Sequence, residues 1–126
     1  MRAPLVLGIG TDLVEVDRLK RAWDRTGERF LEKIFTQKEL AYCRAFSDPW
    51  PHLAARFAAK ESVMKALGFY VNPLDIEIVR CGSGAPRVAL HGSARARAHR
   101  KGVGELKVTL SHAGRLAIAQ SIAVGR

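Results

Sequence analysis

The chain has 126 residues, of which 48% are hydrophobic, and a formal net charge of +9 at pH 7. This length predicts one domain, residues 1–126, and the lack of any stretch of about 20 apolar residues excludes a transmembrane helix. The charge favours an anionic partner, such as a nucleic acid, a phosphorylated small molecule or an acidic protein, and the lack of a secretory signal predicts a cytoplasmic location.

The first predicted element is a strand that begins at Leu5 and reaches Asp12. Because side chains alternate between the two faces of a strand, Gly8 and Gly10 share one face and leave it nearly bare. Another backbone or a ligand can therefore come close to this face. The two glycines do not match a dinucleotide-binding fingerprint, which requires a third glycine and the start of a helix.

A basic helix is predicted next, over residues 17–33. Arginines recur on it at steps of three and four residues and so form one ridge. We call this set the arginine ridge: Arg18, Arg21, Arg25 and Arg29. Residues 36–39, Thr-Gln-Lys-Glu, form a capping-box pattern that predicts a further helix running to about Arg44. The ridge is either a solvated helix face or a docking surface for an acidic partner.

A long helix is predicted to begin near residue 51 or 52 and to end at Gly68. An apolar stripe runs along it, and Glu61 lies at the edge of this stripe between Lys60 and Lys65. We expect the Lys60 stem to pack on the stripe while its amine reaches solvent. A carboxylate between two lysines suits a metal-bridged phosphate, and the simpler alternative is a core helix with a Glu61–Lys65 surface pair.

The second half of the chain predicts strands over residues 75–80, 87–91, 105–111 and 116–124, with a helix between the second and third of them. Ser93 is the expected N-cap of that helix, on which Arg97, Arg100 and Lys101 are expected to be solvated. Residues 82–84 are expected to form a turn, and His112 directly follows the third of these strands. The order of elements predicts an α+β fold with an antiparallel sheet packed against helices.

Three segments occur in a fixed order: Gly-Ile-Gly-Thr-Asp at 8–12, Arg-Phe-Ala-Ala-Lys-Glu at 56–61 running to Lys-Ala-Leu-Gly at 65–68, and Ser-His at 111–112. Together they resemble the bacterial holo-acyl-carrier-protein synthases, the short single-domain members of the 4′-phosphopantetheinyl transferase superfamily. Residues 75–78 and 84–86 match as well. The resemblance implies an antiparallel sheet packed against a long helix and shorter helices. It also implies a homotrimer whose active sites lie between subunits.

The implied activity is transfer of the 4′-phosphopantetheine arm of coenzyme A to a serine of apo acyl carrier protein in fatty acid biosynthesis, with release of 3′,5′-ADP. The resemblance implies that Asp12 and Glu61 bind Mg²⁺, which proteins usually hold with one or two carboxylates, substrate phosphates and water. Lys65 is implied beside the phosphates, so the catalytic residues are Asp12, Glu61 and Lys65. The implied coenzyme A site consists of Arg56, Lys65, His112, Gly84 and Pro86. The base that accepts the serine proton is left open.

The resemblance further implies that an acidic acyl carrier protein docks on the arginine ridge, with Arg18 and Arg21 nearest to Asp12. A basic cluster at residues 95–101 stays unassigned. The rival interpretation is a small nucleic-acid-binding module, but it leaves Asp12 and Glu61 without a purpose and lacks aromatic residues interleaved with the basic ones. We therefore expect neither a nucleic acid nor a membrane as partner. A carrier domain of a polyketide or peptide assembly line stays an open alternative as the substrate.

Overall fold

The computed structural model describes residues 5–80 and 84–126. The strands form two antiparallel sheets. The larger sheet has the order β1-β5-β4 and consists of β1 (Val6–Glu15), β4 (Val103–Ala113) and β5 (Leu116–Gly125). The smaller sheet is a pair of strands, β2 (Ile76–Arg80) and β3 (Pro86–Leu90).

The helices lie along the chain in the predicted order. They are α1 (Val16–Thr26), α2 (Glu28–Glu32), α3 (Gln37–Arg44), α4 (Trp50–Leu67) and α5 (Gly92–Arg100), with a short 3-10 helix, η1 (Pro73–Asp75). The α+β class and the antiparallel sheet are confirmed. None of the helices in the described part of the chain is long and apolar enough to cross a membrane.

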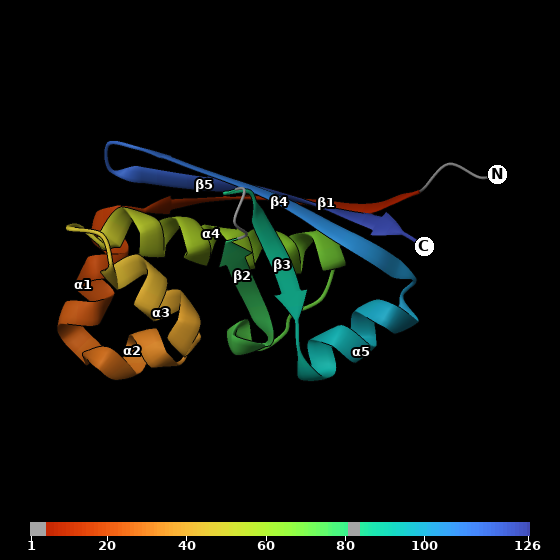
Figure 1. Ribbon diagram of the computed structural model, residues 1–126, viewed down its shortest axis with the longest axis horizontal. Coiled ribbons are helices and arrows are strands. Elements are labelled where there is room, and N and C mark those ends of the chain that lie inside the picture. Colours follow the sequence, from red (N-terminus) through yellow and green to blue (C-terminus); the bar gives the residue numbers. More distant parts are fainter. Residues whose placement is uncertain (1–4, 81–83) are drawn as a thin grey trace.

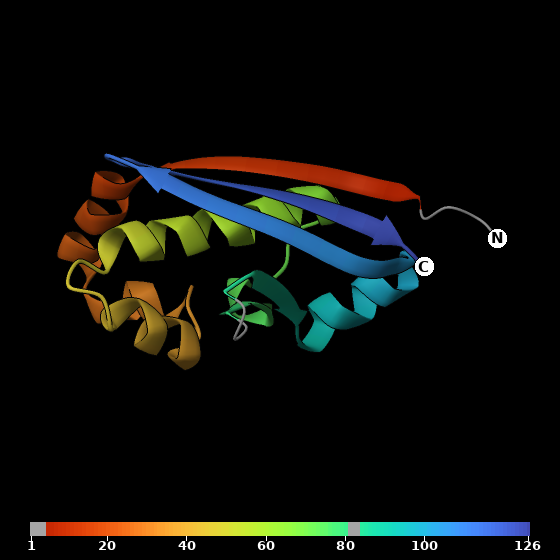
Figure 2. The same ribbon diagram turned by 45° about the horizontal axis from the view of Figure 1, so that its top comes forward.

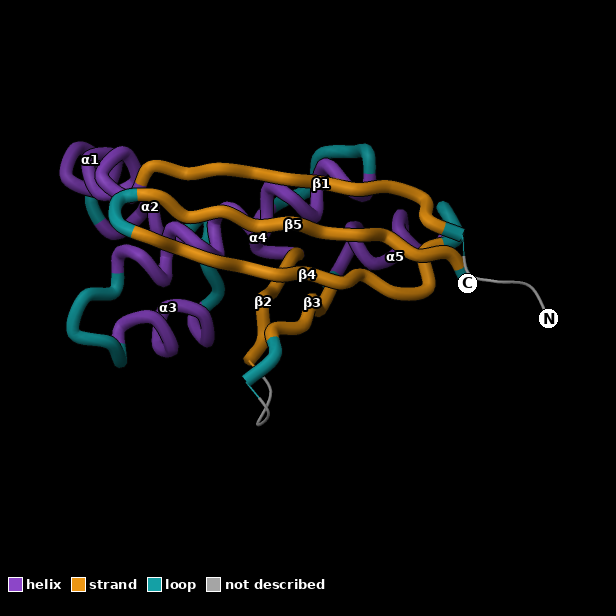
Figure 3. Tube along the Cα trace, turned by 90° about the horizontal axis from the view of Figure 1, so that it is seen from above, coloured by secondary structure: helices purple, strands orange, loops and turns teal. Residues whose placement is uncertain are grey.

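Helix α4 is the centre of the molecule. The larger sheet forms a layer along one side of it, and Figure 3 shows β1, β5 and β4 side by side with α4 beneath them. Helices α1, α2 and α3 gather at one end of the other side, the β2–β3 pair lies beside the middle of α4, and α5 lies at the other end (Figures 1 and 2). Residues from every layer contribute to one buried apolar core.

The glycines of β1 allow the sheet to lie directly on α4. A Cβ atom added to Gly8 would lie 2.0 Å from the backbone oxygen of Ala66, and one added to Gly10 would lie 1.9 Å from that of Ser62. The facing side of β5 is also small, with buried Ala119 and a 2.6 Å hydrogen bond between the hydroxyls of Ser121 and Ser62. The bare strand face expected from the sequence therefore packs against the helix backbone.

Two local expectations are wrong. The helix expected over residues 17–33 is interrupted at Gly27, whose φ of +77° ends α1 and separates it from α2. The N-cap of α5 is His91 rather than Ser93, whose hydroxyl lies 3.5 Å from Asp75 Oδ2. The capping box of α3 is confirmed in both of its hydrogen bonds. Of the turn expected at residues 82–84, only Gly84 belongs to the described residues.

Lys60 also differs from its expectation, because its amine is buried rather than solvated. The side chain is 1% exposed, and Nζ lies 2.6 Å from Glu39 Oε1. Nζ also donates hydrogen bonds of 2.8, 3.0 and 2.8 Å to the backbone oxygens of Ile34, Pro73 and Ile76. A buried charge is tolerated when it is paired and hydrogen-bonded in this way. Lys60 thus joins α4 to the segments around α3, η1 and β2, and its role is structural.

The contact between β1 and α4 predicts that Gly10→Ala is strongly destabilising. The new methyl group would overlap a helix backbone oxygen, so the strand or the helix must move, and we expect a loss of about 3 kcal/mol or more in the free energy of unfolding. Thr11→Ala, on the exposed side of the same strand, should cost less than about 1 kcal/mol. Chemical denaturation of the two variants measures both values, and similar small losses would contradict the tight contact.

Candidate active site

Asp12 and Glu61 line one groove, although they come from different layers. Asp12 lies on the α4 side of β1, and Glu61 lies in the middle of α4. Both border a groove of about 490 Å³ that we call the carboxylate groove. Because Gly8 and Gly10 bring β1 against α4, the two carboxylates predicted from separate segments meet in this groove.

The charges in the carboxylate groove influence one another. Burial raises the pKa of Glu61 above its ordinary value, and the nearby Asp12 charge raises it further, while Lys65 has a smaller opposing effect. The Lys65 ammonium donates to the backbone oxygen of Thr11 at 2.8 Å and lies 3.2 Å from Asp12 Oδ1. The Lys65 side chain is 54% exposed, so its charge is also available to a ligand at the mouth of the groove.

The donor set of this groove fits a hard divalent cation. Two carboxylates that repel each other are stabilised when a cation is placed between them. Within the described residues there is no cluster of three or more His, Cys, Asp or Glu side chains that could hold a metal ion alone. Asp12 and Glu61 would therefore supply two oxygen ligands and leave the others to phosphate and water, which is the arrangement typical of Mg²⁺.

The remaining walls of the carboxylate groove are basic on one side and apolar on the other. Arg18, at the start of α1, lines the groove together with the carboxylates. Leu19, Phe30 and Phe57 supply apolar surface. A ligand that carries phosphates at one end and an uncharged, flexible chain at the other would match this division.

A second pocket contains the other residues that were expected to bind coenzyme A. Arg56, His112 and Pro86 line a hollow of about 420 Å³. Arg80 and His52 line it too, and sequence reasoning missed both because they stand outside the quoted motifs. We call this hollow the arginine pocket, and no Asp or Glu is among the described residues that line it. Gly84, with φ of +87°, is described but does not line it.

Arg56 is a buried cation without a carboxylate partner. It is 3% exposed, and its guanidinium carbon lies 4.1 Å from the centre of the Tyr42 ring. Its Nε atom has no hydrogen-bond partner, and no ion pair joins Arg56 to an acid in the described chain. A buried cation of this kind favours an anion in the pocket beside it. The adjacent Cys43 is no nucleophile, because burial raises the pKa of its thiol to about 11.

The carboxylate groove and the arginine pocket are separate within one chain. Arg56 and Glu61 are five residues apart on α4, which places them roughly 140° apart around the helix axis. Each of the two hollows therefore opens on its own side of α4, and the structure does not bring Asp12 together with His112 in a single hollow.

The arginine ridge is shorter than expected. Arg18, Arg21 and Arg25 share a face of α1 and border a shallow hollow together with Asp24. Arg29 lies on α2, beyond the interruption at Gly27, so it does not continue the same helix face. Arg18 lines both this hollow and the carboxylate groove, which makes the ridge continuous with the predicted metal site.

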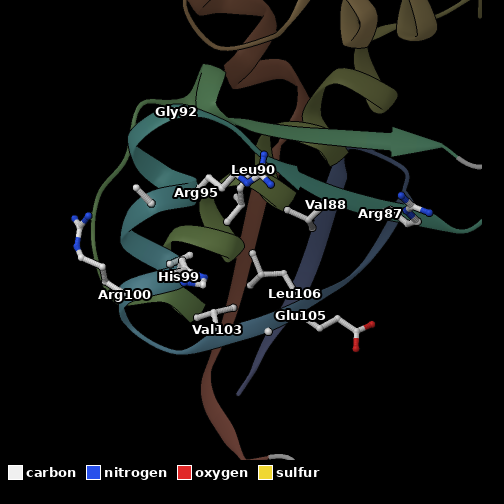
Figure 4. Close-up of a pocket in the computed structure, with 13 residues that line it drawn as sticks. Arg87, Val88, Leu90, Gly92, Arg95, His99, Arg100, Val103, Glu105 and Leu106 are labelled. Atoms are coloured by element: carbon white, nitrogen blue, oxygen red, sulfur yellow. The ribbon is translucent and has the colours of Figure 1, made fainter. Parts of the chain in front are cut away.

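A hollow of about 790 Å³, larger than the carboxylate groove and the arginine pocket, lies at the opposite end of the molecule between β3, α5 and β4 (Figure 4). It contains none of the predicted catalytic residues. Arg97, Arg100 and Lys101 are exposed, as expected, although Arg97 also lies over the Phe69 ring at 4.0 Å and Lys101 donates to the backbone oxygen of Leu67. Two of the basic residues in the 95–101 cluster thus secure the end of α4, which weakens the nucleic-acid interpretation.

Comparisons with known proteins agree with the fold and show the family. The family model of the 4′-phosphopantetheinyl transferase superfamily matches residues 8–119. A holo-acyl-carrier-protein synthase of Moorella thermoacetica is 48% identical over 120 residues, which is 93% of each chain.

Solved structures are similar over the whole fold. The crystal structure of a holo-acyl-carrier-protein synthase from Plasmodium yoelii superposes with a TM-score of 0.88, at 29% identity and 99% coverage of both chains. That of the Helicobacter pylori enzyme in complex with coenzyme A superposes with a TM-score of 0.81, at 28% identity over 91% of this chain and 98% of the other. The chain therefore belongs to the 4′-phosphopantetheinyl transferase superfamily, in its holo-acyl-carrier-protein synthase branch.

Proposed function

We propose that this protein transfers the 4′-phosphopantetheine arm of coenzyme A to a serine hydroxyl of apo acyl carrier protein, with Mg²⁺, in fatty acid biosynthesis. The observation that carries the proposal is the carboxylate groove, in which Asp12 and Glu61 meet beside Arg18 and an apolar wall. Relatives named for this activity and a similar enzyme solved with coenzyme A support it.

Each residue of the groove has a binding or orienting role in this reaction. Asp12 and Glu61 would hold Mg²⁺, which supplies positive charge to the pyrophosphate oxygens when it is bound. Lys65, held by Thr11 and Asp12, adds a further positive charge that favours phosphate at the mouth of the groove. The pantetheine arm would lie along Phe30 and Phe57. Because phosphoryl transfer has a loose transition state, positioning and charge neutralisation supply most of the rate.

The carrier protein would approach over α1. Its acidic helices match the positive charge of Arg18, Arg21 and Arg25, which are exposed on one face. Because Arg18 also lines the carboxylate groove, a carrier docked on this face would have its serine close to the groove. Arg29 contributes less, because Gly27 separates it from the other three.

A trimer with shared sites would join the two hollows. The sheet face that points away from α4 is apolar and open, with Ile9 72% and Leu13 60% exposed on β1, and Ile118 and Ile122 exposed beside them on β5. Monomeric proteins rarely leave such a continuous patch in water. Three copies packed through this face could place the arginine pocket of one subunit against the carboxylate groove of its neighbour, so that one coenzyme A reaches both.

The first test is intact-mass spectrometry of apo acyl carrier protein incubated with this protein, coenzyme A and Mg²⁺. We expect the carrier to gain the mass of one phosphopantetheine. EDTA and Glu61→Gln should each reduce the rate by at least about a hundredfold, because EDTA removes the cation that neutralises the phosphates and the variant removes one of its two proposed carboxylate ligands. A carrier that gains no mass under these conditions would contradict the proposed function.

The same assay should include a structural control for the glutamate. Glu61→Gln preserves the shape of the side chain and removes a charge that burial and Asp12 make unfavourable. We therefore expect the metal-free variant to unfold at a temperature no lower than that of the parent protein. A large loss of stability would assign the lost activity to misfolding instead.

The arginine ridge predicts a separate effect on the carrier protein. The double variant Arg21→Glu, Arg25→Glu, at two ridge residues that do not line the carboxylate groove, should raise the KM for apo carrier by at least about tenfold, because two attractions become repulsions. The KM for coenzyme A should change by less than about twofold. Steady-state kinetics with each substrate varied in turn measures both values. The double variant Arg95→Glu, Arg100→Glu, at the far end of the molecule, is the charge-matched control, and equal effects on both substrates would contradict docking on α1.

Shared active sites predict that two inactive variants restore activity when mixed. Glu61→Ala lacks a metal ligand and His112→Ala lacks a residue of the arginine pocket. After subunit exchange at equal amounts, about a quarter of the interfaces would combine an intact Glu61 with an intact His112, and activity should rise towards that fraction. Mass spectrometry of the intact assemblies verifies the exchange. Mixed trimers without recovered activity would show that each chain holds a complete site.

A further inference from the structure

His52 lies where an anionic ligand of the arginine pocket would be recognised. It lies in the first turns of α4, four residues before Arg56, so both side chains point to the same side of the helix. The ring lines the arginine pocket together with Arg56, Arg80 and His112. Because no acid among the described lining residues balances these groups, the pocket offers up to four positive charges to a ligand.

The orientation of the His52 ring is fixed by its neighbours. Its face stacks on Phe46, with ring centroids 3.6 Å apart and planes inclined by 15°. On another side it meets His112 in an edge arrangement, with centroids 5.3 Å apart and planes inclined by 75°. These aromatic contacts hold the imidazole in one position before a ligand binds. The ring is therefore a preorganised donor.

The surroundings of His52 favour its neutral form in the free protein. Burial lowers the pKa of His52 below its ordinary value, and the charges of His112, Arg56 and Arg80 lower it further, whereas Asp48 raises it. A bound anion reverses this balance, because it faces the same ring with a negative charge. Anion binding in the arginine pocket would thus be coupled to protonation of the imidazole.

The chemistry of coenzyme A identifies the phosphate concerned. Two of its three phosphates form the pyrophosphate that the proposed function places in the carboxylate groove. The third is the 3′-phosphate of the ribose, a monoester that carries roughly −1.5 to −2 charges at neutral pH. It is the group that is free to enter a pocket with uncompensated positive charge, such as that of buried Arg56.

We propose that His52 takes up a proton when coenzyme A binds and donates a hydrogen bond to the 3′-phosphate, which makes it a specificity-determining residue against 3′-dephospho-coenzyme A. The proton comes from solvent, and no covalent bond changes. Phe46 acts as a positioning residue that sets the direction of this hydrogen bond. The inference rests on the proposed function, since it concerns how the same substrate is selected.

The test compares kcat/KM for coenzyme A and for 3′-dephospho-coenzyme A with apo carrier protein. His52→Phe keeps a ring stacked on Phe46 but cannot donate, so the ratio of the two kcat/KM values should fall about tenfold, the effect of one hydrogen bond to a charged group. His52→Lys restores a cation at the position and should recover part of the ratio. His99→Phe, on α5, is the matched control and should leave the ratio unchanged.

The pH dependence separates proton uptake from packing. In the parent protein, KM for coenzyme A should rise with pH from the lowered pKa of free His52 up to the higher pKa of His52 in the complex, by at most about tenfold per pH unit for one proton, because the bound form loses its donor as the imidazole deprotonates. The rise of KM with pH should be weaker in both variants. His52→Phe has no imidazole to titrate, and the lysine of His52→Lys keeps its charge over this pH range. An unchanged ratio, an equal loss with both substrates, or the same pH profile in all three proteins would overturn the inference.

Direct binding keeps this test independent of the proposed function. Calorimetry of 3′,5′-ADP and of 5′-AMP, in buffers of different ionisation enthalpy, counts the protons taken up with each ligand. The parent protein should take up a fraction of a proton when it binds 3′,5′-ADP. We expect no such uptake when it binds 5′-AMP, nor when His52→Phe binds 3′,5′-ADP. Identical proton uptake in the parent and the variant would overturn the role of His52, whereas failure of the carrier to gain mass would overturn the transferase activity instead.

Discussion

The close contact between β1 and α4 is the constraint on which the rest of the structure depends. Without side chains at Gly8 and Gly10, the strand lies against the backbone oxygens of the helix, nearer than any other residue would allow. The larger sheet as a whole is thereby drawn onto α4, with small residues of β5 continuing the contact. The same approach brings Asp12 beside Glu61, so that the packing of the core and the formation of the carboxylate groove have one cause.

A polar network secures the opposite side of α4. The Lys60 ammonium binds Glu39 and three backbone oxygens, and Glu39 in turn accepts hydrogen bonds from the backbone of Thr36 and Ile78. Removing either charge would leave the other buried and unpaired, which is strongly destabilising. Two lysines five residues apart therefore have opposite roles: Lys60 is enclosed and structural, whereas Lys65 is exposed beside Asp12.

The two sides of α4 also divide the charges that a phosphorylated substrate needs. Carboxylates suited to a divalent cation line one hollow, and uncompensated cations line the other. A single chain offers these as separate half-sites, and it also leaves an apolar sheet face open. Shared sites in a trimer would explain both features at once, because the subunit contact that covers the apolar face would also join the half-sites.

The sequence by itself determined the class of fold and most of the element boundaries, because these depend on local patterns such as alternation, capping and glycine placement, whereas the proposed site residues came from the resemblance to a known family. The sequence could not predict that the Lys60 amine is buried, since burial of an amine depends on hydrogen-bond acceptors from three distant segments. Nor could it place the break at Gly27, because a glycine tolerates both a helical and a left-handed backbone. Only the tertiary structure separated Asp12 from His112 and added His52 and Arg80 to the arginine pocket, because a pocket is defined by which helix face each side chain occupies and by what packs across from it.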